Sequence, residues 1–257
     1  MQTVYAEYSF ALVAVSLVVA AIGSFIAFHA LRSAALSGPG AARYRGVALA
    51  SVAMGGVGIW SMHFVGMVAI KLLVPHGYSL WETVVSLGVA IAATAAAFST
   101  LVARPTDRRR LLLAALLLGL GVCAMHYLGM HGMRFDGYFV WSMPTVLASL
   151  VLSVVGAAIA LWLVFAAQSD KALRAAPIVM AAAVSGMHYI AMSAADFVCT
   201  VAPRRNMVSS GGIVGSNDLT VLITASLLVI MAVLALDQWL WSDPQLIEDD
   251  DAPPFQR

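Results

Sequence analysis

The chain has 257 residues, of which 61% are hydrophobic and only 11% are charged, and its formal net charge is +1. Because a soluble domain carries about 25% charged residues, this composition predicts an integral membrane protein and excludes one that binds nucleic acid through a basic surface. With only two cysteines, Cys123 and Cys199, the sequence predicts no disulfide framework.

Seven apolar stretches are long enough to cross a bilayer, which requires about 20 residues of helix. In chain order they span residues 8–31, 46–70, 82–103, 111–133, 143–167, 175–197 and 219–240. The first stretch is too long for the core of a signal peptide, so we expect it to be a retained helix. The predicted fold is therefore all-α, an integral membrane bundle of seven transmembrane helices within residues 1–241.

Lysine and arginine residues predict the orientation, since they are enriched in cytoplasmic loops. The loops after the first, third and fifth helices hold nine of them, whereas the loops after the second, fourth and sixth hold four. We therefore expect the N-terminus outside the cell and the C-terminus in the cytoplasm. The acidic, proline-containing residues 242–257 are expected to form a disordered cytoplasmic tail.

Three stretches share the pattern Met-His-aromatic-x-small-Met, and their histidines are 63 and 62 residues apart. They are "WSMHFVGM" at 60–67, "CAMHYLGM" at 123–130 and "SGMHYIAM" at 185–192. This spacing indicates an internal repeat, a two-helix unit present three times, with the first or the seventh helix left over for packing. The second, fourth and sixth helices run in one direction and carry the motif in their last third. We therefore expect the three histidines to meet at a common axis near the outer surface.

Each motif offers a histidine nitrogen and thioether sulfurs to a shared centre. Residues four apart share one face of a helix, so the histidine and the second methionine of a motif face the same way. The first methionine points about 100° away, and for it ligation and simple packing are both open. The candidate metal ligands are His63, His126, His188, Met67, Met130, Met192, Met62, Met125 and Met187.

Imidazoles combined with thioethers suit copper, above all Cu(I). Both ligand types are neutral, so Cu(I) leaves one positive charge in the site, and no carboxylate lies inside the predicted helices to offset a second. Asp196, just beyond the third motif, is a candidate to orient a ligand histidine, and Cys123 offers a further sulfur on one helix. We expect Tyr127 and Tyr189 to be aromatic residues of the outer membrane interface, and His131 to be exposed.

At these motifs the sequence resembles the MHYT sensor domains of bacteria, and the resemblance covers nearly the whole chain. It is carried by Met62-His63, Met125-His126 and Met187-His188. The resemblance implies a multi-pass domain of the bacterial inner membrane, with a copper site near the outer face proposed to sense a diatomic gas such as O2, CO or NO. The threonine that ends the family's name motif is replaced here by Val65, Leu128 and Ile190, which argues against a hydroxyl role at that position.

Members of that family are often joined to cytoplasmic diguanylate cyclase or phosphodiesterase domains. The resemblance therefore implies a cyclic-dinucleotide signalling domain or protein as partner, besides the lipid bilayer and a small gas ligand. It implies a sensory chain rather than an enzyme. The chain is then either a stand-alone member or the sensory part of a longer protein.

Other functions remain open from the sequence. A copper transport or delivery protein would carry further methionine and histidine steps through the membrane, and below the motifs only Met54 and Met180 offer themselves. A haem protein would use two of the three histidines as axial ligands and leave the third idle. A metal-dependent membrane enzyme would require carboxylates beside the histidines, and none is placed to serve.

Overall fold

The computed structural model describes residues 2–4, 7–72, 74–167, 169–199 and 212–241. The predicted cytoplasmic tail, 242–257, lies outside the described residues, as do Arg204 and Arg205, which entered the count of loop charges. Within the described residues, seven helices are long and apolar enough to cross a membrane. The seven predicted spans are therefore confirmed.

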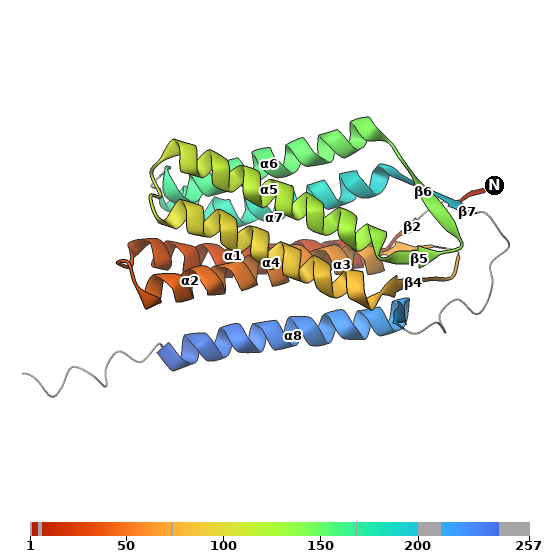
Figure 1. Cartoon of the computed structure of the whole chain (residues 1–257), viewed down its shortest axis with the longest axis horizontal. Coiled ribbons are helices and arrows are strands. Elements are labelled where there is room, and N and C mark those ends of the chain that lie inside the picture. Colours follow the sequence, from red (N-terminus) through yellow and green to blue (C-terminus); the bar gives the residue numbers. More distant parts are fainter. Residues whose placement is uncertain (1, 5–6, 73, 168, 200–211, 242–257) are drawn as a thin grey trace, which may run out of the picture.

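The helices form an elongated bundle whose long axis is shared by all of them (Figure 1). Their bounds are α1 Phe10–Leu36, α2 Ala41–Ser51, η1 Val52–Ser61, α3 Met62–Val68, α4 Leu80–Val102, α5 Arg108–His131, α6 Met143–Phe165, α7 Asp170–Ser193 and α8 Ser216–Trp241. The elements α2, η1 and α3 follow one another without a break and form the second membrane-spanning helix, Ala41–Val68. The N-terminal strand and the last turns of α8 lie at opposite ends of the bundle (Figure 1).

The second spanning helix departs from α-helical geometry, because its ten central residues, Val52–Ser61, form a π-helix. The segment contains Gly55, Gly56 and Gly58, whose low helix propensity weakens the ordinary α-helical ladder. Ser61 donates a hydrogen bond from Oγ to the carbonyl of Gly56 at 2.8 Å. Wide turns of this kind are rare and occur most often beside functional sites, and here the π-helix ends directly before Met62 and His63.

Short strands gather at one end of the bundle, where the sequence predicted only loops and helix ends (Figure 1). Strands β1 Gln2–Val4, β7 Ala195–Cys199 and β6 Gly137–Trp141 form one sheet, and β2 Glu7–Tyr8 pairs with β3 Ile70–Lys71. The third sheet contains β5 Met133–Phe135, β4 His76–Ser79 and β8 Ile213–Gly215. The predicted sixth span, 175–197, was therefore too long, because its last residues pair with β6 and β1 instead of continuing the helix.

The three helix pairs pack through small residues that recur at the repeat spacing. Within each pair, one small residue of the first helix faces one of the second, so that a Cβ atom added to a glycine would overlap the partner. The facing residues are Gly23 and Gly58 in the first pair, Ala93 and Gly121 in the second, and Gly156 and Ala183 in the third. Because small residues allow membrane helices to approach closely, the repeat read from the motifs is also a repeat of the helix crossings.

Helix α8 is the helix left over from the three pairs, and it lies along the outside of the bundle (Figure 1). Ile230 of α8 packs at Gly56 of η1, where an added Cβ would lie 3.1 Å from Cδ1 of Ile230. Arg45 of α2 forms a salt bridge with Asp237 of α8, with Nη2 and Oδ2 2.5 Å apart. The bundle thus contacts α8 at the π-helix and again at the end opposite the strands.

Candidate metal centre

The ends of three helices bring the motif histidines to one level. Helices α3, α5 and α7 end at Val68, His131 and Ser193, and in each the motif histidine lies five residues before the end. At about 1.5 Å of rise per residue, each imidazole lies roughly 7–8 Å below the strand-bearing end of the bundle. His63, His126 and His188 all have exposed fractions of 0%.

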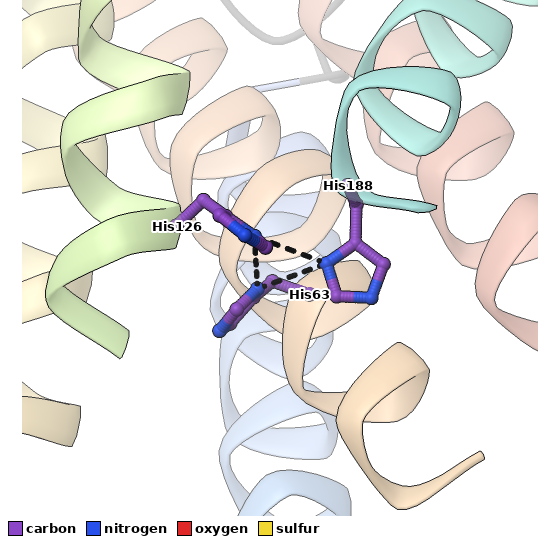
Figure 2. Close-up of side chains that lie close together, drawn as sticks. All are labelled: His63, His126 and His188. Atoms are coloured by element: carbon purple, nitrogen blue, oxygen red, sulfur yellow. Dashed lines mark hydrogen bonds between the residues drawn. The ribbon is translucent and has the colours of Figure 1, made fainter. Parts of the chain in front are cut away.

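The three imidazoles point toward one another with their Nδ1 atoms (Figure 2). The Nδ1 atoms of His63 and His188 are 3.1 Å apart, and His126 Nδ1 lies 3.2 Å from each of the other two. The planes of the three rings are steeply inclined to one another, at 81–87°. The cluster is therefore a nearly equilateral triangle of nitrogen atoms, with one corner from each repeat.

Protons alone cannot satisfy this triangle. The Nδ1 of an imidazole is either a hydrogen-bond donor or an acceptor, never both at once. If one of the three Nδ1 atoms is protonated, the lone pairs of the other two still face each other. If two are protonated, their two N–H groups face each other. A cation at the centre, accepting all three lone pairs, removes this conflict.

The triangle also has dimensions that suit a metal ion. The centre of a triangle with these sides lies about 1.8 Å from each corner, a few tenths of an ångström short of the usual metal–imidazole bond of about 2.0–2.1 Å. The three histidines form the group of His, Cys, Asp and Glu side chains that could hold a metal among the described residues. A haem is less compatible with this arrangement, since axial ligands lie on opposite faces of a macrocycle and these nitrogens touch one another.

The six motif methionines are all buried, with exposed fractions of 2% or less; in each motif one directly precedes the histidine and the other lies four residues after it. Burial is required of a thioether that ligates a buried ion, and it is equally what packing would produce. Their ligation therefore stays a prediction. The structure does add that Met54, below the motifs, accepts a hydrogen bond at Sδ from Ser24 Oγ at 3.8 Å.

Three accessory residues considered from the sequence lie away from the histidine cluster. Asp196 is exposed in β7, and the histidine Nε2 atoms have no hydrogen-bond partner among the described residues; the expectation that Asp196 orients a ligand histidine was wrong. Cys123 is buried, but it is not in the group of side chains that could hold a metal among the described residues. His131 is exposed as expected, with its side chain 73% accessible and its Nδ1 3.8 Å from Glu82.

The tyrosines that follow the second and third motif histidines are hydrogen-bonded to neighbouring helices. Tyr127 is 3.0 Å from Ser149 and Tyr189 is 2.7 Å from Ser16, hydroxyl to hydroxyl in both cases. These serines belong to α6 and α1, so each tyrosine links its motif helix to the first helix of the next pair. These two hydrogen bonds were not predicted from the sequence, and the assignment of Tyr127 and Tyr189 to the outer interface stays a prediction. The signal that was missed is the serine recurring in the partner helices.

A second layer of aromatic rings covers the motif aromatics from the strand side. Phe64 meets Tyr78, Tyr127 meets Trp141 and Tyr189 meets Tyr8, with ring centroids 5.4–6.3 Å apart and planes inclined at 74–76°. Burial raises the pKa of Tyr78 in β4, and also that of Tyr8 in β2. The strands thus place an aromatic layer above the histidines, which sequence periodicity in the helices did not predict.

Comparison with known proteins relates this chain to bacterial signalling proteins. The sequence model of the MHYT family, described as a bacterial signalling protein N-terminal repeat, matches residues 56–115 and 119–176. The chain is 37% identical over 196 residues to the bifunctional diguanylate cyclase/cyclic di-GMP phosphodiesterase MucR of Pseudomonas aeruginosa, covering 74% of this chain and 28% of that protein. It is 26% identical over 207 residues to the signaling protein YkoW of Bacillus subtilis, covering 78% of this chain and 26% of that protein.

A further relative is the cyclic di-GMP phosphodiesterase NbdA of Pseudomonas aeruginosa, 36% identical over 151 residues, covering 54% of this chain and 18% of that protein. The chain thus spans less than a third of the length of these relatives. No solved structure matches. With seven spanning helices and these relatives, the protein is a multi-pass protein of the bacterial inner membrane.

Proposed function

Because the chain belongs to the MHYT family of bacterial signalling proteins, we propose that its membrane sensory module works through a copper ion held by the three motif histidines. The observation that carries this proposal is the triangle of Nδ1 atoms, 3.1–3.2 Å apart and fully buried. A buried cluster of three like lone pairs is unfavourable unless a cation occupies its centre.

Copper fits the donor set better than other metals. Imidazole nitrogens and thioether sulfurs are neutral ligands of the kind that bind Cu(I), and the described cluster contains no carboxylate. In this proposal His63, His126 and His188 supply nitrogen, and Met67, Met130 and Met192 supply sulfur from the same helix faces. The first methionines, Met62, Met125 and Met187, remain the alternative sulfur ligands. When bound, Cu(I) supplies a soft, singly charged centre that can take a small gas such as O2, CO or NO as a further ligand.

The chain's own residues offer a route from this centre to the cytoplasm. His63 lies two residues after η1, and η1 packs directly against Ile230 of α8. A displacement of His63 therefore reaches α8 through a single helix contact. Since the relatives include proteins named as enzymes of cyclic di-GMP metabolism, the proposed recipient of the signal is a cyclic-dinucleotide domain joined to α8 or supplied by another protein.

Metal analysis of the detergent-purified protein after copper loading tests this proposal. We expect stoichiometric copper in the wild-type protein and none in His63→Ala/His126→Ala/His188→Ala. The matched control is His29→Ala/His76→Ala/His131→Ala, which removes the same number of imidazoles from outside the cluster and should retain the metal. Copper binding that is equal in both triple variants would overturn the assignment.

Two further measurements separate sensing from the alternative functions. Carbon monoxide added to the copper-loaded protein should give an infrared stretch that is absent from the cluster variant. A copper transport or delivery protein would instead move copper into proteoliposomes, with uptake lost in the same variant. Uptake without a carbon monoxide signal would replace sensing by transport.

A further inference from the structure

In His188 and His63, the ring edge that carries Nε2 lies against a glycine of another repeat. A Cβ atom added to Gly66 of α3 would overlap Nε2 of His188, and its next neighbours are Cδ2 at 2.9 Å and Cε1 at 3.2 Å of the same ring. A Cβ atom added to Gly129 of α5 would overlap Nε2 of His63, followed by Cδ2 at 3.1 Å and Cε1 at 3.4 Å. At both glycines the three nearest atoms all belong to a histidine ring.

Among the described glycines, these two alone have a histidine ring as the nearest neighbour of an added Cβ atom. Where Gly23, Gly55 and Gly119 approach a neighbouring helix, an added Cβ would meet backbone atoms first. Those glycines therefore set the distance between helices, whereas Gly66 and Gly129 leave space for a side chain. The motif's small residue, three positions after its histidine, thus has a role distinct from close helix packing.

The contacts between these glycines and histidines run in one direction around the bundle axis, from each repeat to the one before it. Gly66 of the first repeat faces the histidine of the third, and Gly129 of the second repeat faces the histidine of the first. The same rotation predicts that Ala191 of the third repeat faces His126 of the second. Ala191 is fully buried, with an exposed fraction of 0%, as this position requires.

We propose that Gly66, Gly129 and Ala191 are positioning residues that seat the Nε2 edges of the three imidazoles and so direct all three Nδ1 atoms to the centre. Nδ1 is bonded to Cγ, close to the backbone, so coordination through it requires each ring to lie alongside the neighbouring helix. Nε2 then points away from the centre and into that helix, where a small residue is required: a glycine at the first two seats, where a Cβ atom would overlap the ring, and an alanine at the third. The seat selects the coordinating nitrogen, in the way that groups around a metal ligand fix its tautomer and orientation.

The proposal deepens the proposed function, but its first test does not depend on a metal. In the metal-free protein, Gly66→Ala should lower Tm, because the new methyl group overlaps the His188 ring. In the His188→Ala background the same change should lower Tm little, since the vacated space accommodates the methyl group. Such coupling between two substitutions is the signature of direct contact. Gly129→Ala and His63→Ala should show the same coupling as Gly66→Ala and His188→Ala.

A control and a third pair of substitutions show whether this coupling is specific to the seats. Gly88→Ala, on α4, places a methyl group where nothing lies within 4 Å, and it should raise Tm slightly through the helix propensity of alanine, to the same extent in either background. Ala191→Val extends the test to the third seat, where the loss should be relieved by His126→Ala. If Gly66→Ala lowers Tm equally with and without the His188 ring, it acts through helix packing and the proposal is overturned.

The second test asks whether the seats act on the metal. Gly66→Ala and Gly129→Ala should weaken copper binding by about 10- to 100-fold, the range found for groups that orient a ligand, while Gly88→Ala binds as the wild type does. X-ray absorption at the copper edge should show fewer nitrogen neighbours in the seat variants. Wild-type affinity in Gly66→Ala would refute the positioning role. Absence of copper from the wild type would refute the proposed function, and the Tm cycle would then decide alone whether the seats hold the rings.

Discussion

His63 is carried by a helix unlike those that carry His126 and His188. Helices α5 and α7 run as continuous α-helices through their motifs, whereas the helix of the first repeat changes to a π-helix over Val52–Ser61 and returns to α-helical geometry only at Met62. The three Nδ1 atoms are nevertheless 3.1–3.2 Å apart. The position of the rings is therefore not inherited from one backbone geometry.

The anchoring of the motif helices differs in the same way. In the second and third repeats, the tyrosine after the histidine bonds a serine of the next helix pair. In the first repeat that residue is Phe64, and the indole of Trp60 takes over, donating from Nε1 to Ser86 Oγ at 3.2 Å and to the Thr83 carbonyl at 3.0 Å. The comparison teaches that the link between pairs is preserved while the residue that makes it moves by one helical turn.

Removing single histidines should have the largest effect, and it tests whether the three repeats contribute equally to the site. If the three corners are equivalent despite their different helices, His63→Ala, His126→Ala and His188→Ala should each weaken copper binding by more than the roughly 10- to 100-fold cost of disturbing a group that only orients a ligand. Competition titration against a copper chelator measures this. A His63→Ala protein that binds as tightly as the wild type, beside two defective variants, would show that the first repeat stands outside the site.

The helix crossings provide the next largest effect. Gly23→Ala would place a methyl group on the backbone of Gly58, and overpacking of this kind costs about 1–3 kcal/mol. The third pair already holds a methyl group at the equivalent crossing, Ala183 against Gly156, so Ala183→Gly should cost only about 0.5–1 kcal/mol, the usual penalty of glycine in a helix. Unfolding in mixed detergent compares the two. Equal losses would mean that the crossings are not equivalent in tightness.

The substituted anchor of the first repeat comes next. Trp60→Phe removes the indole N–H from a fully buried position, leaving the acceptors at Thr83 and Ser86 without this donor. We expect a loss of about 1–3 kcal/mol, because two hydrogen bonds worth about 0.5–1.5 kcal/mol each are removed, with copper stoichiometry retained. A Trp60→Phe protein as stable as the wild type would show that Phe64 and its neighbours alone hold the first repeat.

The tyrosine anchors should have the smallest effect. Tyr127→Phe and Tyr189→Phe each remove one hydroxyl from a half-buried hydrogen bond and keep the ring contact with the strand aromatics. Each should cost about 1 kcal/mol, measured by the same unfolding transition. A loss larger than that of Trp60→Phe would reverse the order and make the tyrosines the principal links between pairs.

Much of the architecture followed from the sequence. The apolar runs predicted seven spans within a few residues of their ends; the second, fourth and sixth predicted spans run past their helices into the strands β3, β5 and β7. The spacing of His63, His126 and His188 predicted a threefold repeat with its histidines at one level. Both rest on local properties of the chain, length of apolar helix and periodicity, which need no knowledge of neighbours.

The contacts of the accessory residues could not be predicted from the sequence. Asp196 lies four residues beyond a motif methionine, where a continuing helix would have turned it toward the cluster, but strand pairing with β6 directs it outward. Tyr127 and Tyr189 look like interface residues on a single helix, and their serine partners lie 22 and 173 residues away. Such contacts depend on which helices become neighbours.

The sequence by itself determined that this protein crosses the membrane seven times and carries one histidine on each of three repeated helices, because hydrophobic length and repeat spacing are written along the chain. The tertiary structure decided which edge of each imidazole faces the axis. That choice depends on Gly66 lying against His188 and Gly129 against His63. Steric exclusion acts between helices distant in sequence, and it exists only once those helices are packed.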